Sequence, residues 1–205
     1  ENEAAANHLR RVVQESPSSL AHVMLAMAYQ RMAQSDLARS ELLAAVRLDE
    51  SNLVARRALA QLYLESGNYV LAIQEAEATL RRAPDDLAVV LLRARALAAN
   101  RQRTEAKAVL DAIEYPEGAN PRRVEAVLLY LQIGAGDEAI ALAEAVLADE
   151  PANSEALDLW ATHKARTGES EVALARVNQA IEDSPDDASL YELRAGVALG
   201  VVTGG

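Results

Sequence analysis

The sequence predicts an all-α fold in which helical hairpins stack on one another, and three observations indicate it. Apolar residues recur at spacings of three and four, which places them on one face of a helix. Several residue types repeat with a common period of about 34 residues. The chain is 51% hydrophobic but only 3% aromatic. Ala, Leu and Val therefore carry the apolar weight, which suits thin layers of closely packed helices.

The common period is clearest in five alanines. Ala38, Ala72, Ala106, Ala139 and Ala173 follow one another at intervals of about 34 residues, and the interval from Ala106 to Ala139 is one shorter than the others. The same period fits Pro17, Pro84, Pro151 and Pro185, as well as Gly67, Gly134 and Gly168, and Tyr29, Tyr63 and Tyr130. Independent residue types rarely share one period by chance, so the sequence predicts a repeat architecture along its whole length.

Each period contains a helix, a break and a second helix, as residues 53–86 illustrate. Gly67 interrupts the apolar pattern in the middle of the unit, and Pro84 ends it because proline cannot continue a helix. The small side chains of Ala60 and Ala72 are expected to let the two helices approach closely at their crossing. Helix-capping side chains are expected at Asp36, Asn68, Thr104, Asn120 and Ser154.

The second unit resembles the tetratricopeptide repeat family, which is built from helix-turn-helix units of about 34 residues. The matching residues are Leu59, Ala60, Tyr63, Gly67, Tyr69, Ala72 and Pro84. The resemblance implies a right-handed α-α superhelix, a solenoid of such hairpins. Five repeats are predicted, at 19–52, 53–86, 87–119, 120–153 and 154–187. Residues 1–18 are expected to be the second helix of an incomplete repeat, and 188–205 the first helix of another with a frayed tail.

The third repeat departs most from the family pattern. Arg93 occupies a normally apolar position, and Arg101 stands where glycine is usual. The segment 115–118 leaves this repeat one residue short of the period, so a local irregularity is expected there. In the first repeat, Glu50 replaces the usual proline.

Composition and motif spacing exclude several kinds of chemistry. The formal net charge of −11 argues against nucleic acid as a partner, because that function needs a surplus of cations. The chain has no Cys, and His8, His22 and His163 lie in different repeats without other ligands at metal-binding spacing. No stretch approaches the ~20 apolar residues of a membrane span. We therefore expect no catalytic residues, no cofactor, no metal and no membrane insertion, and the chain is not expected to be an enzyme.

In this family the first helices of the repeats line a concave groove that binds a peptide or protein. The resemblance implies that fixed repeat positions face this groove. The partner-binding residues expected on that basis are Leu20, Val23, Met27, Arg31, Arg57, Gln61, Leu91, Arg95, Val124, Leu128 and Asp158. The groove is more apolar than a solvated surface requires, which favours a binding surface. The alternative is that the register is wrong by a turn and the apolar members pack against the second helices.

Charge is distributed unevenly along the predicted groove. Arg31, Arg57 and Arg95 belong to the first three repeats, whereas Glu125, Glu155, Asp158 and Glu192 come later, with Glu65 and Arg166 as exceptions. This distribution favours a bound segment whose acidic end lies towards the first repeats. A dense basic cluster is formed by Arg93, Arg95, Arg101 and Arg103. These arginines either pair with nearby acids or dock an acidic partner.

The function expected from these observations is a protein–protein interaction scaffold that binds a peptide, helix or partner domain. One alternative is a periplasmic docking array of an exopolysaccharide or cell-envelope assembly and secretion system, although Trp160 and six tyrosines offer few platforms for sugars. Another is a regulatory arm of an enzyme whose catalytic domain lies outside this segment, since the chain begins at Glu1 and both ends resemble incomplete repeats. The compartment stays open between the bacterial cytoplasm and the periplasm, with an inclination towards the periplasm.

Overall fold

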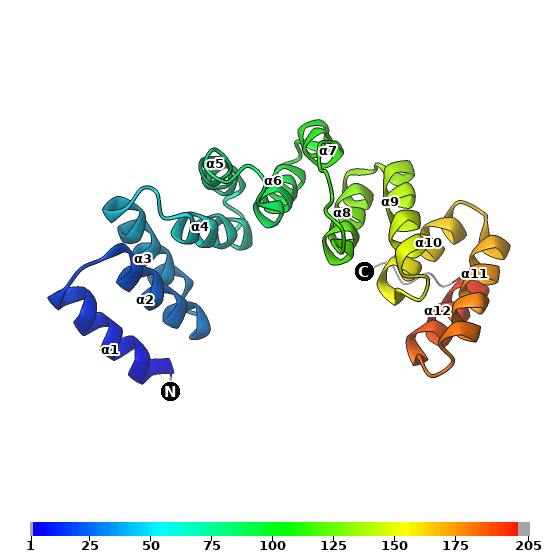
Figure 1. The fold of residues 1–205 in the computed structure, drawn as a ribbon, viewed down its shortest axis with the longest axis horizontal. Helices are drawn as coiled ribbons and strands as arrows, with labels where there is room; N and C mark the ends of the chain where they lie inside the picture. The colour runs from blue at the N-terminus through cyan, green and yellow to red at the C-terminus, as the bar shows by residue number, and fades with distance from the viewer. Residues whose placement is uncertain (1, 201–205) are drawn as a thin grey trace. The chain divides into compact units, whose positions relative to one another are not determined.

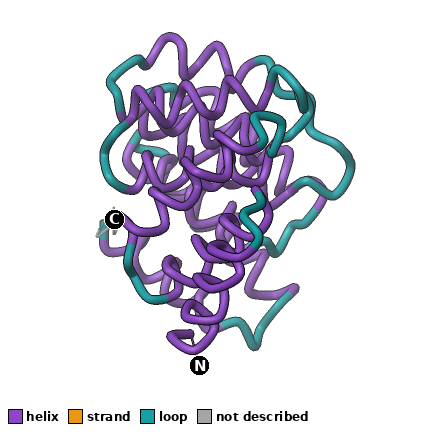
Figure 2. Tube along the Cα trace, turned by 90° about the vertical axis from the view of Figure 1, so that its left-hand side faces the viewer, coloured by secondary structure: helices purple, strands orange, loops and turns teal. Residues whose placement is uncertain are grey.

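The structure is a computed structural model that describes residues 2–200. These residues form α-helices joined by turns and loops, as Figures 1 and 2 show. The expected tail at 201–205 lies outside the described residues. The helices are α1 (Asn2–Glu15), α2 (Ser19–Arg31), α3 (Ser35–Leu48), α4 (Leu53–Glu65), α5 (Tyr69–Leu80), α6 (Leu87–Ala99), α7 (Arg103–Asp111), α8 (Asn120–Ile133), α9 (Gly136–Asp149), α10 (Ser154–Arg166), α11 (Ser170–Asp183) and α12 (Ala188–Leu199).

Small residues lie where the two helices of a hairpin meet. Ala38, Ala72, Ala106, Ala139 and Ala173 all have no exposed surface. The period seen in the sequence is thus a period of buried contact positions, and a larger side chain there would have to displace the neighbouring helix. The all-α fold expected from the sequence is confirmed.

The caps of the helices differ from those expected. Asn68 is the N-cap of α5 but makes no side-chain capping bond. Asp36, Thr104, Asn120 and Ser154 lie inside the first turns of their helices. The side chains that accept a bond from a backbone N–H of the first turn belong to Ser18, Asn52, Asp86, Asn153 and Asp187. Each immediately precedes the first helix of a hairpin, and an oxygen there satisfies a donor that the helix itself leaves unpaired.

The turns inside the hairpins require a left-handed backbone. Gly67, Gly134 and Gly168 adopt it with φ of 76°, 84° and 92°. At the equivalent turns of the first and third hairpins the residue is not glycine: Ala33 has φ of 56° and Arg101 has φ of 63°. A side chain costs about 1–2 kcal/mol in this conformation, so the fold imposes strain at both places.

The described chain divides into two compact units at the boundary between Val109 and Leu110, here called unit 1 and unit 2. This boundary lies in α7, which is the shortest helix described, at nine residues. A non-helical stretch from residue 112 to 119 follows it. The irregularity expected at 115–118 is therefore present, because the second helix of the third hairpin ends early.

Within each unit the helices form two layers. In unit 1, α2 contacts α4 and α4 contacts α6, whereas α1, α3 and α5 touch only even-numbered helices among the described residues. Unit 2 repeats the arrangement, with α8 against α10 and α10 against α12. We call the even-numbered helices the inner layer of each unit and the odd-numbered ones the outer layer. A partner that lies across the inner layer can touch several repeats at once.

Candidate partner-binding face

One side of α2 carries apolar side chains that are exposed. Leu20, Met24 and Met27 are 66%, 48% and 44% exposed. Their spacing of four and three residues places them in one stripe along the helix, and Arg31 continues the stripe one turn further. Burial in the core cannot explain these residues, because the buried face of α2 is occupied by others such as Leu25 and Ala26.

The neighbouring inner helix α4 extends this surface. Val54 is 55% exposed, and Arg57 follows it on the same side of the helix. Gln61 is half-buried there, and its Nε2 donates to Oε1 of Glu65 at 2.7 Å. Because α2 and α4 are in contact, we treat Leu20, Met24, Met27 and Val54 as one surface, the apolar face.

Three residues expected on the binding surface are instead part of the core. Val23, Leu91 and Val124 are 2%, 0% and 2% exposed. Successive residues on a helix are turned by ~100°, so Met24, the position after Val23, is exposed whereas Val23 itself is buried. The expectation that these three are accessible is wrong, because their side chains are buried in the core.

Met24 is the residue that the repeat positions missed. It lies four residues after Leu20 and three before Met27, a spacing that would have placed it in the same stripe. The helical spacing within α2 was thus a better guide to exposure than a position carried over between repeats. Arg57 leads to the same conclusion, because it occupies the same repeat position as the buried Val23 but is exposed.

The arginines of unit 1 differ in their partners. Arg57 pairs with Asp86, the capping residue of α6. The NH2 group of Arg93 lies 2.9 Å from Oε1 of Glu77 on the outer helix α5, which matches the first of the two interpretations of the basic cluster. Arg95 is half-buried on α6, whereas Arg101 and Arg103 are exposed at the turn into α7.

In unit 2, the expected residues Leu128 and Asp158 are exposed on the inner helices α8 and α10. Asp158 borders a pocket of about 420 Å³ between α10 and α12. Glu155 and Glu192 are carboxylates in the lining of this pocket, and Leu193 is an apolar residue in the same lining. The Oγ1 hydroxyl of Thr162 donates to Oδ1 of Asp158 at 3.4 Å.

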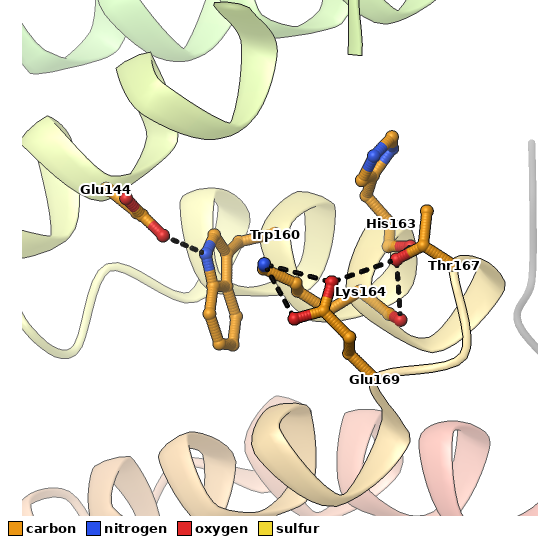
Figure 3. Close-up of polar contacts among 6 residues, drawn as sticks. All are labelled: Glu144, Trp160, His163, Lys164, Thr167 and Glu169. Atoms are coloured by element: carbon orange, nitrogen blue, oxygen red, sulfur yellow. Dashed lines mark hydrogen bonds and ion pairs between the residues drawn. The ribbon is translucent and has the colours of Figure 1, made fainter. Parts of the chain in front are cut away.

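Trp160 on α10 is hydrogen-bonded to Glu144, as Figure 3 shows. Its ring is buried, and its Nε1 donates to Oε1 of Glu144 at 3.1 Å. The guanidinium of Arg176 lies 4.8 Å from the ring centre. Nearby, Nζ of Lys164 lies 3.0 Å from Oε2 of Glu169, across the turn between α10 and α11. The indole therefore offers no open platform for a sugar.

Two further properties of the described residues bear on function. Between residues 2 and 200, no three His, Asp or Glu side chains are arranged to hold a metal ion. Over the same residues no helix combines the length and the apolar character needed to cross a bilayer.

Paired helices in two layers, recurring with a period of about 34 residues, define a helical-repeat protein, and the sequence comparisons name the family. A model described as the Psidin N-terminal tetratricopeptide repeat region matches residues 56–172, more than half of the chain. A tetratricopeptide repeat model matches residues 23–86. The chain belongs to the tetratricopeptide repeat family. No curated protein sequence matches it.

Solved structures have a similar fold at low sequence identity. A tetratricopeptide repeat protein from Parabacteroides merdae is 18% identical with a TM-score of 0.73, and the match covers 98% of this chain and 80% of that one. PilF of Pseudomonas aeruginosa is 18% identical with a TM-score of 0.68, over 95% and 89% of the two chains. YrrB, described as a tetratricopeptide repeat protein with an unusual peptide-binding site, is 21% identical with a TM-score of 0.65, over 93% and 100%.

Proposed function

We propose that this protein is a non-catalytic scaffold that binds a peptide or helix of a partner protein across the inner layer of unit 1. The observation that carries the proposal is the apolar face, where Leu20, Met24, Met27 and Val54 are each exposed by more than two fifths. Grouped apolar side chains of this kind on a folded surface mark a site of association, because covering them removes apolar surface from water.

The chemistry of the face suits an apolar side chain of a partner. Two of its four residues are methionines, whose flexible and polarisable side chains adapt to partners of different shape. An amphipathic helix or an extended segment lying along α2 would place its anchors at the spacing of Leu20, Met24 and Met27. The peptide-binding site reported for YrrB, a protein of similar fold, supports a role in binding rather than catalysis.

Two other groups of exposed residues are proposed contacts, each apart from the apolar face. Arg101 and Arg103, at the turn into α7, are available to an acidic partner, as expected from the basic cluster. In unit 2, Leu128 and Asp158 are the accessible members of the expected set and form a separate proposed contact.

An unbiased selection tests this function. Peptides from a random displayed library are selected on the full chain, and the affinities of the selected peptides are then measured by fluorescence anisotropy. The combined Leu20→Ser and Met27→Ser variant should weaken them by at least about tenfold, since each loses the burial of a large apolar side chain.

A matched control distinguishes binding at this site from non-specific binding to exposed apolar residues. Leu37 on α3 and Val70 on α5 are also exposed apolar residues, but they belong to the outer layer. The Leu37→Ser and Val70→Ser variant should bind the same peptides as the unaltered protein does. Selection of no peptide, or equal loss in the two double variants, would refute the proposed function.

A further inference from the structure

The inner helices of unit 1 carry a net positive charge, in contrast to the chain as a whole. α2, α4 and α6 contain Arg31, Arg56, Arg57, Arg93 and Arg95, and Glu65 is their one carboxylate. The chain as a whole has a net charge of −11. This layer therefore has a positive net charge, although acidic residues outnumber basic ones elsewhere.

The outer layer neutralises two of these arginines. NH1 of Arg56 lies 2.8 Å from Oε2 of Glu75, and Arg93 pairs with Glu77. Both carboxylates belong to α5. These two cations hold the hairpins together and are directed away from the apolar face.

Arg31 and Arg57 lie beside the apolar face instead. On α2, Arg31 follows Met27 by four residues, and on α4, Arg57 follows Val54 by three. Arg31 is exposed and has no ion-pair partner among residues 2–200. The ion pair of Arg57 with Asp86 leaves about half of the Arg57 side chain exposed. The single carboxylate of this layer, Glu65, accepts a hydrogen bond from Gln61.

On both helices a cation thus follows the exposed apolar positions, in the direction of the helix C-terminus. We propose that the apolar face binds an acidic amphipathic segment, in which apolar anchors meet Leu20, Met24, Met27 and Val54 and carboxylates meet Arg31 and Arg57. This inference rests on the proposed function and adds the charge of the partner. Charge complementarity selects the partner and accelerates its association, while the apolar contacts supply most of the affinity.

Helix polarity offers a competing explanation for Arg31. A cation in the last turn of a helix is favoured by the helix dipole whether or not a ligand binds. Arg47 provides the matched control, because it is exposed in the last turn of α3 in the outer layer. Arg31→Glu and Arg47→Glu change the net charge and the end of a helix in the same way, and they differ in their distance from the apolar face.

The experiment uses the full chain and two synthetic fluorescent peptides of about four helical turns. Both have leucines at the same helical positions, and their remaining charged positions are all Glu in one and all Lys in the other. We expect the glutamate peptide to bind at least about tenfold more tightly than the lysine peptide, and this preference to shrink as the salt concentration rises. Arg31→Glu should remove most of the preference, and Arg47→Glu should keep it within about twofold.

Other outcomes overturn the inference and identify which step failed. If both peptides bind equally, or if Arg31→Glu and Arg47→Glu have equal effects, the acidic partner is refuted. Loss of binding in the Leu20→Ser and Met27→Ser variant would then leave the proposed function standing. If neither peptide binds, the acidic amphipathic segment is again refuted. The proposed function is then tested independently by the selection from a random library.

Discussion

Two residues other than glycine, Ala33 and Arg101, occupy turn positions with positive φ. At the corresponding turns of other hairpins the residue is Gly67, Gly134 or Gly168. The third hairpin therefore combines a strained turn with a short second helix, and the first hairpin has the strained turn alone. This strain is local, because the helices on both sides of Ala33 pack normally.

Replacing Ala33 with glycine should therefore stabilise unit 1. Relief of the left-handed strain exceeds the additional chain entropy that glycine loses on folding, and we expect a gain of about 0.5–1 kcal/mol. Urea unfolding followed by circular dichroism measures it. Ala44→Gly, in the interior of α3, is the control and should cost about 1 kcal/mol. A loss of similar size in Ala33→Gly would show that the turn is not strained.

Two tyrosines of unit 2 differ in whether the hydroxyl group has a hydrogen-bond partner. The Tyr130 hydroxyl donates to Oδ1 of Asp111 at 3.0 Å. The Tyr115 hydroxyl is buried and has no hydrogen-bond partner among the described residues. Burial raises the pKa of Tyr115 to about 12, from an ordinary value of 10.0. Burial and the bond to Asp111 also raise the pKa of Tyr130.

These raised pKa values predict a loss of stability in alkali. The folded state holds each phenolic proton more tightly than the unfolded state, so the stabilisation is complete below about pH 10. It is lost as the pH rises from there towards the folded-state pKa of Tyr115, about 12. Unfolding measured across this range should show a smaller alkaline loss for Tyr115→Phe than for the unaltered protein.

At neutral pH, replacing each of these two tyrosines with phenylalanine should change the free energy of unfolding differently. Tyr115→Phe removes an unsatisfied buried hydroxyl and should be neutral or stabilising, whereas Tyr130→Phe breaks a hydrogen bond and should cost about 0.5–1.5 kcal/mol. An equal cost for both would mean that Tyr115 has a partner after all.

The architecture depends on the helical hairpin. In the hairpin of α4 and α5, Ala72 lies on α5 where the two helices are expected to cross. Ala60 and Ala72 both have no exposed surface. Ala72→Trp should overpack this crossing and destabilise the protein by at least about 1–3 kcal/mol. Val70→Trp, on the exposed side of the same helix, should stay within about 0.5 kcal/mol of the unaltered protein. Thermal unfolding of the two variants tests this. Unchanged stability of the Ala72→Trp variant would contradict the close packing at this position.

Hairpins were predictable from the sequence because the contact positions repeat. A buried alanine recurring once in every repeat, together with apolar residues at helical spacing, identifies both helices and the turn between them. Helix ends were less predictable. The expected cap Ser154 is one residue beyond the observed cap Asn153, because periodicity alone leaves a helix terminus uncertain by a residue or two.

The binding surface was only partly predictable, for a geometric reason. A repeat position carried over from a family assumes that every first helix presents the same side to solvent. Position five is buried in the first and third repeats, at Val23 and Leu91, but exposed in the second, at Arg57. Leu20, Met27 and Arg31 are exposed as expected, although partner binding itself stays a prediction.

At the scale of the whole molecule, a repeat fold presents the apolar face on the inner layer of unit 1. In a solenoid each hairpin is held by its neighbours, so the inner layer stays available to a ligand while the outer layer supports it. The chain contains three methionines, Met24, Met27 and Met32. The first two belong to the apolar face, whereas Met32 is partly buried against the core.

The methionine methyl groups therefore report directly on the proposed site. The protein is labelled with 13C at these methyls, and a peptide selected from the random library is added during NMR. The resonances of Met24 and Met27 should shift or broaden as the peptide binds, and that of Met32 should change little. Saturated binding that leaves Met24 and Met27 unchanged would contradict a partner-binding role for this face.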